Sequence, residues 1–254
     1  MKDMWDANLY DGKHSFVSML GNDLLDMLAP KQGEQILDIG CGTGDLANEL
    51  QEQQVKVIGI DKSENMVQQA KNKYPQITFL VKDAVDLKYT SEFDAIFSNA
   101  TLHWVKTPKQ ALNCIYKSLK TGGRFVAEFG GKGNVQQITN EIFNQYRELG
   151  LEIEVSRFPW YFPSIAEYTT IMEEVGFRVT FAQHFDRPTA LDANSGLRNW
   201  IEMFASSLFE GQSENVKEKM IVGVEKNLKE TLYQEEHWIA DYKRIRVVGF
   251  KEDI

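Results

Sequence analysis

Short apolar runs alternate with helix-like patterns through the first half of the chain. The runs predict buried strands at residues 35–39, 55–60, 77–82, 93–98 and 124–129. Amphipathic stretches between them predict helices at residues 45–52 and 64–73, and a third that starts at Thr107-Pro108 and is stopped by Gly122-Gly123. Such alternation is typical of βαβ units around a parallel sheet.

The second half is predicted to be more helical. Helices are expected at residues 134–149, 197–209 and 214–233, and a capping box at Ser164 and Glu167 opens another that Gly176 closes. Strands are expected at residues 177–183 and 244–250. We therefore predict an α/β fold, a doubly wound, Rossmann-like and mostly parallel sheet with a helical cap from the second half. Residues 1–254 are predicted to form a single domain.

Composition and charge argue against several classes of protein. Asp and Glu number 37 against 28 Lys and Arg, which gives a net charge of −9 and argues against non-specific nucleic-acid binding. No apolar run is long enough for a transmembrane helix, and the first ten residues do not resemble a signal peptide. With only Cys41 and Cys114, neither a disulfide scaffold nor a metal site is expected. We expect a cytoplasmic protein.

A glycine-rich turn after the first predicted strand is the sharpest local feature. Asp38 precedes Gly40, Gly42 and Gly44 at a strand-to-helix junction. Glycines there let a ligand approach the backbone closely. The spacing differs from the Gly-x-Gly-x-x-Gly of nicotinamide and flavin folds, and no Gly-Lys-Ser/Thr follows. Asp38 would oppose a phosphate but suits an amino group; alternatively, it only orients the turn.

Two further carboxyl groups follow later strands. Asp61 ends the second predicted strand, where doubly wound folds bind a ribose diol. Asp83 follows the third, where it could accept a hydrogen bond from an adenine amino group or simply start a turn. An amine, a ribose and an adenine in this order describe S-adenosylmethionine.

With these motifs, residues 33–129 resemble the class I S-adenosylmethionine-dependent methyltransferases. The resemblance divides the single domain into an N-terminal lid and helix (1–32), a cofactor-binding core (33–130) and cap helices with the remaining strands (131–254). It implies S-adenosyl-L-methionine as cofactor, with no metal. The cofactor-binding residues that it implies are Tyr10, Asp38, Gly40, Cys41, Gly42, Asp61, Lys62, Met66, Asp83, Ala84 and Asn99. Cys41 is given no nucleophilic role.

The segment from Ser98 to Trp104 narrows the resemblance to the trans-aconitate methyltransferase group, and the related malonyl-acyl-carrier-protein O-methyltransferases are the alternative. Both methylate a carboxylate oxygen, so we expect a small acid as substrate. The substrate-binding residues predicted on this basis are Trp5, His14, Arg157, Trp160 and Arg187. Arg198 is a further candidate for an anion clamp, although surface ion pairs are the ordinary role of an arginine.

His103 and Trp104 are the predicted catalytic residues, acting through pocket shape and alignment. His103 is the obvious candidate for a general base, but a carboxylate needs no base at neutral pH. A polar wall of the pocket is therefore the favoured role. Methylation of nitrogen or another oxygen, and a cofactor-binding protein without catalysis, stay open as alternatives.

Overall fold

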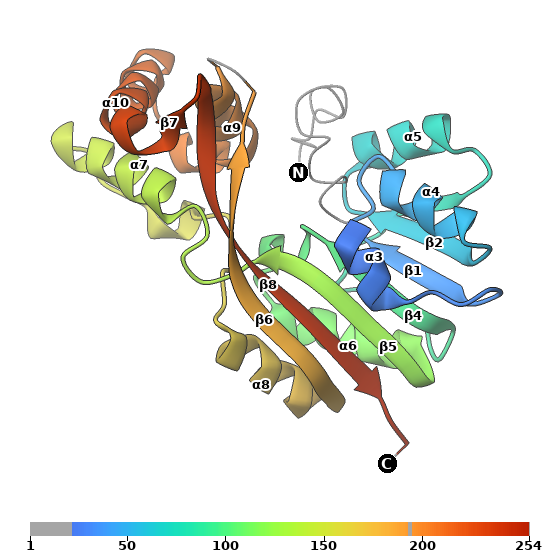
Figure 1. Ribbon diagram of the computed structural model, residues 1–254. Coiled ribbons are helices and arrows are strands. Elements are labelled where there is room, and N and C mark those ends of the chain that lie inside the picture. The colour runs from blue at the N-terminus through green and yellow to red at the C-terminus, as the bar shows by residue number, and fades with distance from the viewer. Residues whose placement is uncertain (1–21, 193–194, 254) are drawn as a thin grey trace. The chain divides into compact units, whose positions relative to one another are not determined.

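The computed structural model describes residues 22–192 and 195–253 (Figure 1). In chain order its helices and strands are α3 (Asn22–Leu28), β1 (Gln35–Ile39), α4 (Asp45–Glu52), β2 (Lys56–Asp61), α5 (Glu64–Lys73), β3 (Thr78–Val81), β4 (Phe93–Asn99), η1 (Leu102–Trp104), α6 (Pro108–Ser118), β5 (Leu119–Gly130), α7 (Gln136–Glu148), η2 (Val155–Arg157), α8 (Ile165–Val175), β6 (Phe177–Ala190), α9 (Gly196–Phe204), η3 (Ser206–Phe209), α10 (Glu214–Leu232), β7 (Tyr233–Gln234) and β8 (His237–Lys251).

The strands of the described residues form one mixed sheet in the order β3-β2-β1-β4-β5-β8-β6, with β7 paired to β8. The first five of these strands are parallel. The arrow of β8 points opposite to that of β5 in Figure 1. The predicted mostly parallel, Rossmann-like sheet is therefore confirmed. Because parallel strands end at the same edge, Ile39, Asp61, Val81 and Asn99 finish on one side of the sheet.

The described chain divides into two compact units. Unit 1 contains the described residues up to Gly130, then Pro163–His184, then those from Ile245 on, and so holds β1 to β5 with α3, α4, α5, α6 and α8. Unit 2 contains Gly131–Phe162 and Phe185–Arg244, with α7, α9 and α10. The second half thus supplies the predicted helices. A single domain over 1–254 stays a prediction.

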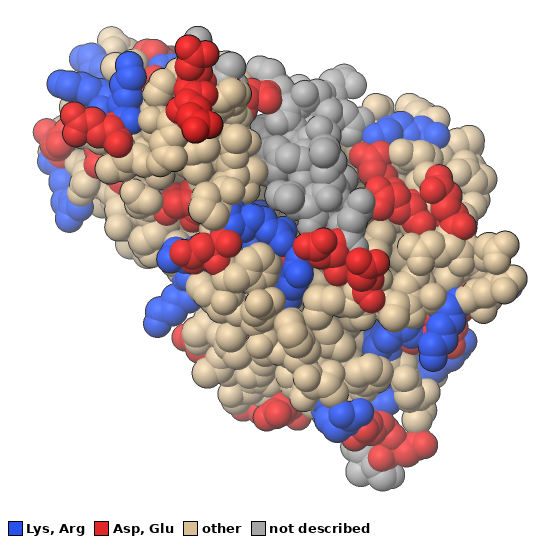
Figure 2. Space-filling model, viewed as in Figure 1, with Lys and Arg blue, Asp and Glu red and all other residues tan. Residues whose placement is uncertain are grey.

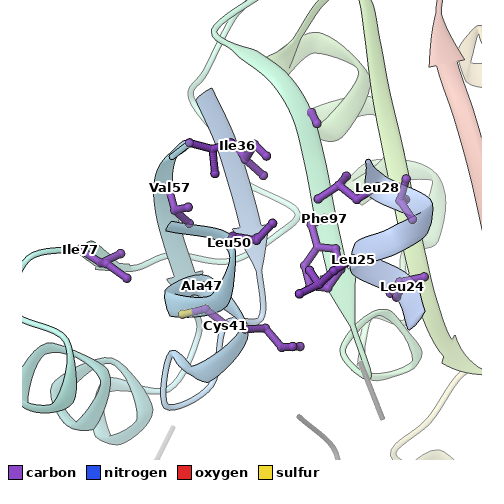
Figure 3. Close-up of a cluster of buried hydrophobic side chains, with 14 of the residues drawn as sticks. Leu24, Leu25, Leu28, Ile36, Cys41, Ala47, Leu50, Val57, Ile77 and Phe97 are labelled. Carbon is purple, nitrogen blue, oxygen red and sulfur yellow. The ribbon is translucent and has the colours of Figure 1, made fainter. Parts of the chain in front are cut away.

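The core of unit 1 is built from alternating strand residues and amphipathic helix faces. Leu24, Leu25 and Leu28 of α3 belong to the same buried cluster as Phe97 of β4, beside which Leu25 lies, while α4 contributes Ala47 and Leu50 (Figure 3). All of these side chains are buried. Helix α3 is therefore fixed against the sheet by apolar contact.

Helix boundaries largely follow the predicted caps. Ser63 accepts a hydrogen bond from the Met66 amide, and Ser164 with Glu167 forms the predicted capping box. Gly176 ends α8 at φ 115°, a left-handed conformation that suits glycine. Thr107 does precede α6, but its side chain makes no capping hydrogen bond.

The predicted ranges of two strands were too short, for a physical reason. Strands β6 and β8 run to 14 and 15 residues, well beyond the predicted ranges of 177–183 and 244–250. Pairing between neighbouring strands extends them through polar residues such as Asp186 and Lys243, which a search for apolar runs cannot detect. Similarly, Leu119 pairs with Phe93 and begins β5, so it does not belong to α6.

An ion pair anchors the connection between α3 and β1. Arg124 on β5 donates to both carboxylate oxygens of Glu34, at 2.8 and 2.7 Å, and also to the carbonyl oxygens of Leu28 and Ala29. The two side chains are only 12% and 16% exposed. Bidentate pairing of this kind specifies geometry as well as charge.

We expect Arg124→Ala to lower the free energy of unfolding by about 2–3 kcal/mol, because Glu34 would stay largely buried without its partner. Urea unfolding followed by circular dichroism measures this. Lys109→Ala is the control: its ion pair with Glu174 is 62% and 51% exposed, so the expected change is below about 0.5 kcal/mol. Equal losses in the two variants would contradict the anchoring role.

Candidate functional site

The glycine loop is held to the sheet by its own backbone. The amides of Gly40 and Cys41 both donate to the carbonyl oxygen of Ile60 on β2, at 2.7 and 3.0 Å. Gly40, Gly42 and Gly44 have φ values of 74°, 53° and 90°, all in the left-handed region. Other residues rarely adopt this conformation, so the Gly-x-Gly-x-Gly spacing follows from the course of the backbone.

Within this loop, the surroundings of Gly40 differ from those of Gly42. A Cβ atom on Gly40 would lie 1.9 Å from Thr101 Oγ1, whereas one on Gly42 would have no atom of the described residues within 4 Å. Thr101 Oγ1 lies within hydrogen-bond distance of the carbonyl oxygens of Asn99, at 3.0 Å, and Gly40, at 3.3 Å. Thr101 thus fills the space beside Gly40, while no other described residue fills the space beside Gly42.

Asp61 joins the end of β2 to the glycine loop. Its Oδ2 accepts from the Gly42 amide at 3.1 Å, and its Oδ1 accepts from the Ser63 amide at 2.9 Å. A carboxylate oxygen can accept more than one hydrogen bond. Because Asp61 is half-buried, its carboxylate can also accept from a ligand's hydroxyl groups.

Asp38 is in a different environment, although it lies close by. The side chain is 2% exposed, and its Oδ2 has no hydrogen-bond partner. Burial, and next the charge of Asp61, raise the pKa of Asp38 to about 8. Burial and then the charges of Asp38 and Asp61 also raise the pKa of Cys41 well above the ordinary thiol value. Cys41 therefore stays a neutral thiol.

The ends of β2 and β3 are linked by an ion pair. Lys62 Nζ lies 2.8 Å from Asp83 Oδ2, and Asp83 Oδ1 accepts from the Val85 amide at 3.2 Å. Lys62 is mostly exposed, whereas Met66 and Ala84 are buried. The structure thus brings together, on unit 1, the predicted residues from Asp38 to Ala84.

The end of β4 carries the predicted catalytic segment. The Ala100 amide donates to the Glu128 carbonyl oxygen on β5 at 2.7 Å, which holds this turn against the neighbouring strand. His103 is buried, and its Nδ1 lies 3.3 Å from the Gly130 amide nitrogen, which donates to it. This contact requires a lone pair on Nδ1, so the proton of the neutral ring is on Nε2. The Trp104 ring centroid lies 5.5 Å from that of His103.

The predicted substrate residues of unit 2 are engaged in contacts within that unit. Arg157 pairs with Glu154 at 2.7 Å and donates to the Glu210 carbonyl oxygen. Trp160 is buried and stacks on Phe162 with ring centroids 5.5 Å apart.

Arg187 lies over the Phe185 ring at 5.0 Å, and Arg198 pairs with both Glu218 and Glu225. For Arg157 and Arg198, the ordinary role of an arginine in an ion pair is thus the one that the structure describes. Trp5, Tyr10 and His14, with the predicted lid, lie outside the described residues.

Two buried charged groups on strands of the described residues were missed by the sequence analysis. Glu128 on β5 is 2% exposed and pairs with Arg246 on β8 within unit 1. Arg244 in unit 2 is 7% exposed and lies 4.4 Å from the Tyr242 ring centroid. The available signal was a charged residue inside an otherwise apolar strand, which is uncommon unless it is paired.

Two absences apply to the described residues. No helix there is long and apolar enough to cross a membrane. No group of three His, Cys, Asp or Glu side chains in the same residues is arranged to hold a metal ion.

Comparison with known proteins places this site in a family. Residues 37–127 match the methyltransferase domain. The chain is 33% identical to an uncharacterised methyltransferase of Schizosaccharomyces pombe, with 99% of each chain covered.

Shorter matches are to enzymes whose names state an activity. Over 175 residues the chain is 28% identical to the malonyl-[acyl-carrier protein] O-methyltransferase of Priestia megaterium, covering 66% of this chain and 64% of the relative. Over 147 residues it is 28% identical to the trans-aconitate 2-methyltransferase of Afipia carboxidovorans, covering 57% of each.

A solved structure supports the fold. The phosphoethanolamine N-methyltransferase 2 of Haemonchus contortus, in complex with S-adenosylhomocysteine, superposes with a TM-score of 0.58 at 21% identity, covering 92% of this chain and 53% of that one. Together with the full-length relative, the domain match and the glycine loop between β1 and α4, this shows that the chain belongs to the class I S-adenosylmethionine-dependent methyltransferases.

Proposed function

We propose that this methyltransferase transfers the methyl group of S-adenosylmethionine to a carboxylate oxygen of a small acid resembling trans-aconitate. The observation that carries the proposal is the state of His103. Because Nδ1 accepts from the Gly130 amide, this contact favours the neutral tautomer that carries its proton on Nε2, and in that tautomer Nε2 acts as a donor rather than as a base. A carboxylate acceptor, already ionised at neutral pH, fits a donor of this kind.

The residues at the sheet edge fit the cofactor. We assign Asp38 and the glycine loop to its methionine part, because Asp38 Oδ2 is a buried acceptor without a donor and the backbone at Gly42 is open. Asp61 is assigned to the ribose hydroxyls, and Lys62, Met66, Asp83 and Ala84 to the adenine. Asn99 is assigned to the sulfonium end. When bound, the cofactor supplies an activated methyl donor.

Similarity to relatives that act on acids supports the choice of acceptor. Transfer to an acyl chain on a carrier protein is the competing reaction, and an acidic carrier would need a basic surface. Figure 2 shows acidic and basic side chains interspersed around α10. Because the chain also carries a net charge of −9, we favour the free acid. Arg157, Trp160 and Arg187 remain proposed substrate residues.

Asp61→Ala should weaken binding of S-adenosylhomocysteine by about 1–3 kcal/mol, because the ribose hydroxyls would lose their acceptor. Titration calorimetry measures the affinity, and circular dichroism checks that the variant is folded. Asp86→Asn is a matched control, since that carboxyl is 68% exposed and pairs only with the exposed Lys88 in the described contacts. Unchanged affinity in Asp61→Ala would refute the assignment of the ribose.

Thr101→Val should weaken cofactor binding about threefold to tenfold, which corresponds to one lost hydrogen bond. Valine keeps the shape of the side chain but cannot donate to the Gly40 and Asn99 carbonyl oxygens. Thr101→Ser, which keeps the hydroxyl, should bind more tightly than the valine variant. The positioning role would be wrong if the valine variant lost thermal stability but retained wild-type affinity.

His103→Ala should retain measurable activity, because no proton has to be removed from a carboxylate. Labelled cofactor and a panel of small acids, compared with acyl-carrier substrates, should give a methyl ester of a free acid that releases methanol in mild alkali. Product mass spectrometry identifies the acceptor. A base-stable product would indicate an ether or an amine, and cofactor binding without turnover would indicate a non-catalytic protein.

A further inference from the structure

Among the described acidic residues at the sheet edge, Asp38 is the one whose charge has no evident compensation. Asp61 accepts two backbone hydrogen bonds, and Asp83 has Lys62 with a backbone amide. Asp38 Oδ2 has no donor within the described chain and is shielded from solvent. An ionised carboxylate in such a place costs several kcal/mol unless it is paired.

Within the described residues, the surroundings of Asp38 add no positive charge. Its strand neighbours are Gly59 on β2 and Phe97 on β4. The helices of this core contribute leucines and alanines, including Leu24 and Leu28 of α3.

Two ionisable groups of the part of the chain that the structure describes interact with Asp38. They are the Asp61 carboxylate on β2, which repels a second negative charge, and the neutral thiol of Cys41. A protonated Asp38 avoids both this repulsion and the cost of burying an anion.

We propose that Asp38 holds a proton in the cofactor-free enzyme and releases it when the cofactor's ammonium group binds, so that cofactor binding is coupled to proton release. This inference rests on the proposed placement of the methionine part at the glycine loop. The O–H bond of the Asp38 carboxyl breaks, its proton passes to the solvent, and the resulting carboxylate pairs with the ammonium ion. Charge-assisted hydrogen bonds of this type are the strong ones.

The size of the effect follows from linkage. With the Asp38 pKa at about 8, about nine-tenths of the free protein carries this proton at pH 7. Binding at pH 7 should therefore release about 0.9 proton. The apparent Kd should be about tenfold weaker at pH 6 than at pH 7, because one proton has to leave for each cofactor bound.

Titration calorimetry with S-adenosylhomocysteine tests this at pH 7. Running the titration in phosphate and in Tris, whose ionisation enthalpies differ, gives the number of protons released. We expect about 0.9 for the wild type and about zero for Asp38→Asn, whose amide has no proton to lose in this range. Asp26→Asn, which removes an exposed carboxyl of α3, should behave like the wild type.

A ligand control separates the ammonium from the rest of the cofactor. 5′-Methylthioadenosine keeps the adenosine and sulfur but lacks the amino acid part, so its binding to the wild type should release no proton. If Asp38→Asn does not fold, this comparison and the pH dependence of the wild-type Kd decide the matter.

Binding of S-adenosylhomocysteine without proton release would overturn the inference and leave cofactor binding intact. Equal proton release by Asp38→Asn, or by 5′-methylthioadenosine, would assign the proton to another group and also overturn it. Absence of any binding would instead overturn the proposed cofactor site.

Discussion

Three carboxyl groups gather at one edge of a parallel sheet, and the rest of the site depends on how their mutual repulsion is controlled. Each is controlled differently. Asp61 is held by the amides of Gly42 and Ser63, Asp83 by Lys62, and Asp38 by burial in a place that favours its protonated form. A bound cation would be attracted to this edge, which suits a ligand that carries both a sulfonium and an ammonium group.

The backbone at the end of β1 makes this arrangement possible. Left-handed glycines direct the amides of Gly40 and Cys41 to Ile60 and leave the Gly42 amide for Asp61. A side chain at Gly40 would collide with Thr101, so the loop and the segment after β4 can approach only because glycine is there. The loop that we propose to contact the cofactor and the segment that carries His103 therefore share this contact, and a change in either should alter both.

Features that depend on residues close together in the chain could be predicted from the sequence. The βαβ order, the glycine loop and the Ser63 cap each depend on residues close together in the chain, and the sheet edge that they define followed from them. The lengths of strands β6 and β8 could not be predicted, because pairing with distant strands stabilises polar residues there that no apolar pattern reveals. The contact of Arg157 with the Glu210 carbonyl oxygen and the burial of Arg244 were equally inaccessible, since they depend on residues brought together by the fold.

The proposed reaction explains why so little catalytic machinery is needed. A sulfonium cation and a carboxylate anion react to give neutral products, so charge disappears as the reaction proceeds. Water stabilises the separated charges more than the less polar transition state, and a site that excludes water favours the transfer. The enzyme then has to align the two groups and bind the anion without neutralising it by proton transfer. In the tautomer that the Gly130 contact favours, the buried His103 presents a donor at Nε2 rather than a base, which meets the second requirement. A protonated general acid there would instead compete with the methyl group for the same oxygen.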